Sequence, residues 1–154
     1  MCFSAGADVT LGLAVGAVGV DALRHVSSPA QLPLAALPVV LGVHQLNEAF
    51  VWWGLTGSTS RLPPEVAAST YLAVAFVLPV VVPVSGARIE LDPRRRSAMW
   101  GLAALGGAVS AVLLVALARG GPTVRAEDWF IAYSVKARHS GVLAVIYVLS
   151  TCGA

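Results

Sequence analysis

A histidine and a glutamate lie four positions apart in the sequence HQLNE, which begins at His44 inside an almost uninterrupted apolar segment. In a helix, His44 and Glu48 share one face, and Asn47 lies beside them at the i+3 position. Trp52 continues that face by another turn, whereas Gln45 points about 100° away from His44. The stretch therefore predicts a narrow polar ridge on an otherwise apolar helix.

Three interpretations of this ridge remain open. In the first, His44 and Glu48 bind a transition metal (zinc, iron or manganese) or a haem-like cofactor, because imidazole and carboxylate groups are ligands of these metals. Gln45, Asn47 and Trp52 would then line the cofactor site. In the second, Glu48 is protonated or paired with His44, and the ridge packs a neighbouring helix or partner in a non-catalytic membrane subunit. In the third, the pair relays protons or binds a polar substrate.

Further metal ligands are few in this sequence. Cys2 is the first candidate, because it lies near an expected membrane surface and a thiolate is a soft ligand. Asp8 is typical of a charge at a helix end, although it could face inward, and His139 precedes the last apolar segment. No HExxH, P-loop, GxSxG or dinucleotide-binding motif occurs, so the sequence assigns no catalytic residue and leaves open whether the chain is an enzyme.

The chain as a whole has the composition of a membrane protein. It has 154 residues, of which 57% are hydrophobic and 12% are charged, and its mean hydropathy is +0.80. A soluble domain carries roughly 25% charged residues, so this chain lacks the polar surface to cover itself in water. A lipid bilayer is the predicted partner. We expect no nucleic-acid binding, because the basic residues form only one short run, Arg94–Arg96, beside a predicted span.

Five apolar segments predict helices that cross a hydrocarbon core of about 30 Å. Runs this rich in Ala and Leu differ from the alternating pattern of a membrane barrel, and a helix satisfies its own backbone hydrogen bonds in lipid. We therefore predict an all-α polytopic transmembrane helix bundle that forms a single domain over residues 1–154. Its spans are predicted near residues 9–23, 34–55, 66–84, 99–117 and 141–154.

The second span sets the depth of the ridge. His44 lies about 15 Å of helix rise beyond Leu34, close to the bilayer midplane. A charged side chain at this depth costs a few kcal/mol on insertion scales, so partners or water must satisfy it. Tyr71 on the third span could supply a hydrogen bond. Trp129, Phe130 and Tyr133 in the long connection before the fifth span are typical of a membrane interface.

Small residues predict how the spans pack. Gly12, Gly16 and Gly19 lie on nearby faces of the first span, and Gly106 and Gly107 give the fourth span a small face. Small residues let helix backbones approach closely in lipid, where no hydrophobic force drives association. These glycines therefore predict a compact bundle.

The basic residues predict an orientation. The ten Lys and Arg residues divide equally between the two sides, with Arg24, Arg88, Arg94, Arg95 and Arg96 on one and Arg61, Arg119, Arg125, Lys136 and Arg138 on the other. The compact Arg94–Arg96 run beside a helix end favours its own side as the inside, which places Cys2 outside. No Lys or Arg precedes the first apolar run, so we expect that span to remain in the mature protein.

Two motifs resemble those of a known family. The chain opens MCFSA, and the segment LPLAALPVVLGVHQLNEAFVWWG carries His-Gln-x-x-Glu followed by Trp. Together they resemble a bacterial family of small polytopic membrane proteins of unknown function, and the matching positions are Cys2, Phe3, Ser4, His44, Gln45 and Glu48. We expect the protein in the bacterial inner membrane, with a second copy or another membrane subunit as candidate partner. The resemblance implies seven spans, so this chain would lack two helices and a later Trp-Cys motif.

Overall fold

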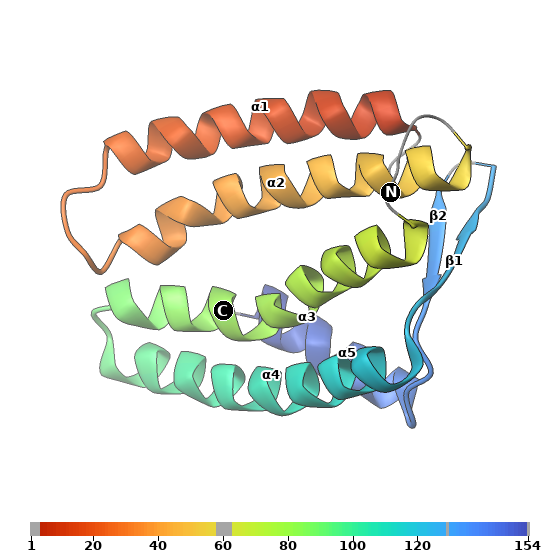
Figure 1. Ribbon diagram of the computed structural model, residues 1–154. Coiled ribbons are helices and arrows are strands. Elements are labelled where there is room, and N and C mark those ends of the chain that lie inside the picture. The colour runs from red at the N-terminus through yellow and green to blue at the C-terminus, as the bar shows by residue number, and fades with distance from the viewer. Residues whose placement is uncertain (1–3, 58–62, 129, 154) are drawn as a thin grey trace.

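Five helices dominate the computed structural model, which describes residues 4–57, 63–128 and 130–153 (Figure 1). The four long helices are α1 (Ala5–Arg24), α2 (Leu32–Leu55), α3 (Pro64–Ile89) and α4 (Pro93–Gly120). Each of these four is long and apolar enough to cross a membrane. The predicted all-α class is confirmed.

The fifth helix covers most of the predicted fifth span but is too short to cross a membrane by itself. Helix α5 (Ser140–Cys152) begins where the sequence pattern places it and is apolar, but it has 13 residues. A helix of this length rises about 20 Å, which is less than the hydrocarbon thickness. Within the described residues, four of the five expected spans therefore reach membrane length.

Local chemistry explains where the long helices begin. The Ser4 hydroxyl accepts a hydrogen bond from the Ala7 backbone N–H at the start of α1. The Asp92 carboxylate accepts hydrogen bonds from the backbone N–H groups of Arg94 and Arg95 at the start of α4. Both side chains satisfy amides that have no partner within their own helix.

The long helices lie in chain order. Helix α1 packs on α2, α2 on α3 and α3 on α4, and α5 packs against α3 and α4 (Figure 1). The bundle therefore consists of two helical hairpins, α1–α2 and α3–α4, which meet along α2 and α3. In this arrangement α2, which carries the polar ridge, has a neighbouring helix on each side.

Glycines bring the helices of each hairpin into close contact, as the sequence predicted for Gly12, Gly19 and Gly106. A Cβ atom on Gly42 of α2 would lie 2.7 Å from the Gly12 carbonyl oxygen of α1, and one on Gly19 would overlap the α2 backbone. In the second hairpin, a Cβ atom on Gly106 of α4 would overlap the Pro79 carbonyl oxygen of α3. Only glycine fits these positions at the present helix spacing.

A β-hairpin occupies the long connection between α4 and α5, where the sequence analysis predicted no strand. Strands β1 (Thr123–Ala126) and β2 (Ile131–Ser134) are antiparallel, with Val124 opposite Tyr133 and Ala126 opposite Ile131. The hairpin lies at the end of the bundle where α2 and α4 end and α3 begins (Figure 1).

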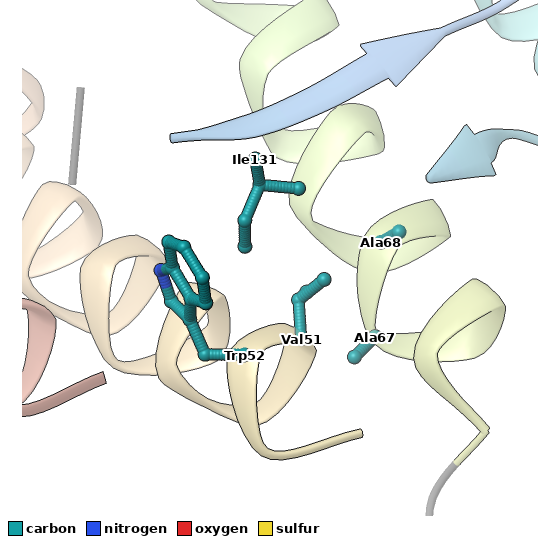
Figure 2. Close-up of a cluster of buried hydrophobic side chains, with 5 residues drawn as sticks. All are labelled: Val51, Trp52, Ala67, Ala68 and Ile131. Carbon is teal, nitrogen blue, oxygen red and sulfur yellow. The ribbon is translucent and has the colours of Figure 1, made fainter. Parts of the chain in front are cut away.

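A cluster of apolar side chains fixes the hairpin to the bundle. Val51 and Trp52 of α2, Ala67 and Ala68 of α3, and Ile131 of β2 are all buried and pack together (Figure 2). Removing such side chains from solvent or lipid contact stabilises a structure through tight packing. The hairpin thus has a defined position over the end of α2, one turn beyond the polar ridge.

Candidate functional site

The polar ridge lies at the centre of a group of polar side chains from four elements. We define this polar cluster as Asp8 of α1, His44, Gln45, Asn47 and Glu48 of α2, Tyr71 of α3 and Tyr133 of β2. His44 is twelve residues after the start of α2 and eleven before its end. It therefore lies at the middle of that helix.

Two amide side chains connect α2 to its neighbouring helices. The Gln45 Nε2 atom donates to Asp8 Oδ1 of α1 at 3.3 Å. The Asn47 Nδ2 atom donates to the Ala67 carbonyl oxygen of α3 at 2.9 Å. Hydrogen bonds of this kind join helices in the low-dielectric interior of a membrane bundle.

A third hydrogen bond connects α2 to the β-hairpin. The Tyr133 hydroxyl donates to Glu48 Oε1 at 3.2 Å. Burial raises the pKa of Tyr133 far above its ordinary value, and the negative charge of Glu48 raises it further. The phenol is therefore neutral and remains a donor to the carboxylate over the physiological pH range.

The aromatic rings of the cluster form a stack. The His44 and Tyr71 ring centroids are 3.9 Å apart with 14° between the planes. Tyr71 in turn stacks on Tyr133 with centroids 4.9 Å apart and the same interplanar angle. The stack spans α2, α3 and β2, and it holds the orientation of the His44 imidazole.

His44 and Glu48 each have a buried polar atom that lacks a partner among the described residues. His44 is 8% exposed and Glu48 is 3% exposed. His44 Nδ1 and Glu48 Oε2 have no hydrogen-bond partner among the described residues. Leaving such an atom unsatisfied costs about 1–3 kcal/mol, and more for a charged group. Water or a ligand at these two atoms would remove that cost.

The whole chain matches a family described as "Family of unknown function (DUF6629)", over residues 1–154. The chain belongs to this family. No curated protein and no solved structure matches it. The family description assigns no activity to its members.

The structure limits the number of metal ligands that the described residues can supply. Among the described residues, no three His, Cys, Asp or Glu side chains are placed to hold one metal ion. His139 is exposed and precedes α5. Cys2, the third ligand that the sequence suggested, lies outside the described residues. His44 and Glu48 are thus the candidate ligands that the structure places.

The structure assembles the cluster differently from the sequence prediction at three positions. Gln45, expected to point away from the ridge, joins the cluster through Asp8, which is fully buried. Trp52 belongs to the apolar cluster, and its buried Nε1 has no partner among the described residues. Tyr133, expected at a membrane interface, reaches Glu48. The glycines of α1 predicted its close packing, and this was the sequence signal that could have indicated that Asp8 contacts another helix.

Proposed function

We propose that the chain is an integral membrane protein whose polar cluster binds a divalent transition-metal ion, with His44 and Glu48 as ligands. The proposal rests on the buried His44 Nδ1 and Glu48 Oε2 atoms, which lack partners among the described residues. The two side chains are four residues apart on one helix, so they share a face. Ionisable groups at the middle of a membrane helix are costly and commonly mark functional sites.

Neighbouring side chains hold both candidate ligands in the way that metal ligands are commonly held. The Tyr133 hydroxyl binds one oxygen of Glu48 and leaves the other available. The Tyr71 ring stacks on the imidazole of His44. Contacts to the groups around a metal ligand fix its orientation and raise metal affinity. One imidazole nitrogen and one carboxylate oxygen suit zinc, iron or manganese.

The geometry favours a metal ion over haem. His44 Nδ1 is buried and Tyr71 lies 3.9 Å from the ring, measured between centroids. An ion can reach a buried nitrogen that a macrocycle cannot approach. The proposal assigns the remaining coordination positions to water and to Cys2, which lies outside the described residues.

Elemental analysis of the purified protein tests this function. After incubation with zinc, iron or manganese salts and removal of free metal, wild type should retain one ion per chain. His44→Ala and Glu48→Gln should lose it. His25→Ala and Glu65→Gln, which alter exposed side chains of the same types, should keep it. Wild type that retains none of the three metals would overturn the proposal.

A second candidate function is a non-catalytic membrane subunit whose polar cluster only ties elements together. It is favoured because the ridge residues contact three different elements, α1, α3 and β2. Asn47→Leu separates the two candidates, since Asn47 bonds to the α3 backbone and lacks a role as ligand. Metal binding predicts an Asn47→Leu protein that is less stable but still loaded. The subunit function predicts lost stability with no metal in any variant.

A further inference from the structure

A groove of about 500 Å³ lies between the C-terminal part of α4 and the segment that joins β2 to α5. Three cations line it: Arg119 of α4, and Lys136 and Arg138 of the joining segment. Val112 and Val115 of α4 line the same groove. We call this feature the basic groove and define it by these five residues.

The basic groove combines charge at a helix end with an apolar wall below it. Arg119 lies in the last turn of α4, at the end of a helix long and apolar enough to span a membrane. Val115 and Val112 lie about 6 and 10 Å deeper along the helix axis. Each valine is 47% exposed. In a bilayer that α4 spans, Arg119 would lie at the level of the lipid headgroups, and the two valines at the level of the acyl chains.

The three cations are available for an anion. The structure records no ion pair for Arg119, Lys136 or Arg138 in the part of the chain that it describes. Arg119 has a local explanation, because a cation in the last turn complements the dipole of its own helix. Lys136 and Arg138 lie in the segment between β2 and α5, outside α4. The dipole of α4 therefore does not account for their position beside Arg119.

We propose that the basic groove binds an anionic phospholipid. The phosphate lies among Arg119, Lys136 and Arg138, and an acyl chain lies along Val112 and Val115. Basic pockets beside membrane helices bind anionic headgroups in this way. A zwitterionic lipid presents its own cation to the three positive side chains, and a soluble phosphate leaves the apolar wall uncovered.

The opposite end of α4 provides a matched control. It carries three consecutive cations, Arg94, Arg95 and Arg96, in the first turns of the helix. All three are exposed, and the Asp92 carboxylate caps the same helix end. The two triads carry equal formal charge at opposite ends of α4, but Arg94, Arg95 and Arg96 do not line the basic groove.

Native mass spectrometry of the full chain in a neutral detergent tests the proposal. Phosphatidylglycerol should remain bound to wild type at concentrations where phosphatidylcholine does not. At about fivefold per cation, the triple variant Arg119→Gln/Lys136→Gln/Arg138→Gln should lose about a hundredfold in affinity for phosphatidylglycerol. The triple variant Arg94→Gln/Arg95→Gln/Arg96→Gln should lose less than about fivefold.

Two further measurements identify the occupant. Val112→Ser/Val115→Ser leaves the charge unchanged and should weaken phosphatidylglycerol binding several-fold. Inorganic phosphate and glycerol phosphate should not displace the lipid at equal concentration. Equal losses in the two triple variants, or displacement by either soluble phosphate, would overturn the proposal. Circular dichroism and thermal unfolding establish that each variant is folded, and because none alters the polar cluster, the outcome is separate from that of the metal test.

Discussion

The two helical hairpins, α1–α2 and α3–α4, pack by the same device but bury different side chains. Gly19 brings α1 against the α2 backbone, and Gly106 brings α4 against the α3 backbone. The first hairpin buries ionisable side chains, among them Asp8 and Glu48, whereas the second buries the hydroxyl-bearing Ser85 and Ser110 among its described residues. Close packing of helices in this chain therefore needs no ionisable group.

This difference bears on the purpose of the polar cluster. Small residues allow close packing of membrane helices at little cost, whereas an ionisable group at the middle of a span costs several kcal/mol. If the cluster served packing alone, the α3–α4 hairpin shows that glycine is a cheaper solution. The contrast thus favours a binding role for His44 and Glu48 over a purely structural one.

The largest expected effect tests whether the hairpins are packed alike. Gly19→Ala and Gly106→Ala each place a Cβ atom against the backbone of the facing helix. We expect each to destabilise the bundle by about 1–3 kcal/mol, because overpacking forces the helices apart. Thermal unfolding in detergent measures the change.

Two other glycines serve as controls for these substitutions. A Cβ atom on Gly16 of α1 or Gly101 of α4 would have no neighbour within 4 Å. Gly16→Ala and Gly101→Ala should therefore unfold at or slightly above the wild-type temperature, since Ala favours a helix over Gly by up to about 1 kcal/mol. A Gly106→Ala protein as stable as Gly101→Ala would contradict the shared packing.

The next prediction compares a polar side chain in each helical hairpin. Glu48→Leu removes the acceptor of the Tyr133 hydroxyl and leaves that half-buried donor without it. We expect a loss of about 1–3 kcal/mol. In the other hairpin, Ser110→Ala removes a buried hydroxyl oxygen that has no partner among the described residues. It should change stability by less than about 0.5 kcal/mol. Equal losses of stability for Glu48→Leu and Ser110→Ala in thermal unfolding would contradict the difference between the two helical hairpins.

A smaller effect separates hydrogen bonds between helices from those within one. Asn47→Leu removes the hydrogen bond from α2 to the Ala67 carbonyl oxygen of α3. The expected loss is about 0.6 kcal/mol, the average for hydrogen bonds between membrane helices. Thr70→Val removes a hydrogen bond from Thr70 to Val66 within α3 and should be nearly neutral. A larger loss for Thr70→Val in unfolding experiments would contradict this order.

Hydropathy predicted the helices because each is a long apolar run whose backbone must be satisfied within the segment. It did not predict the β-hairpin, because β1 and β2 have four residues each. Strands this short carry little pattern of their own. The position of the hairpin depends on packing of Ile131 against α2 and α3, which is a tertiary contact.

Only part of the candidate site could likewise be predicted from the sequence. The shared face of His44 and Glu48 follows from helix periodicity alone, so the sequence was sufficient for the ridge. Asp8 and Tyr133 join it from 37 and 85 positions away, counted between hydrogen-bonded partners. No local pattern encodes such pairings, which arise only when α1 and the hairpin pack against α2.

The last prediction is a pH dependence that tests the hydrogen bond between Tyr133 of the β-hairpin and Glu48 of α2. The pKa of Tyr133 is raised above the ordinary 10.0, chiefly by burial and then by Glu48. Above pH 10 the unfolded state loses a phenol proton that the folded state keeps, so the free energy of unfolding falls as pH rises. The slope from one group is at most about 1.4 kcal/mol per pH unit.

Tyr133→Phe should be less stable than wild type below pH 10, and the difference in stability between the two proteins should narrow between pH 10 and 11 in thermal unfolding. A gap that is constant over this range would show that the hydroxyl ionises as freely in the folded protein as in the unfolded chain, which its contact with the carboxylate of α2 forbids.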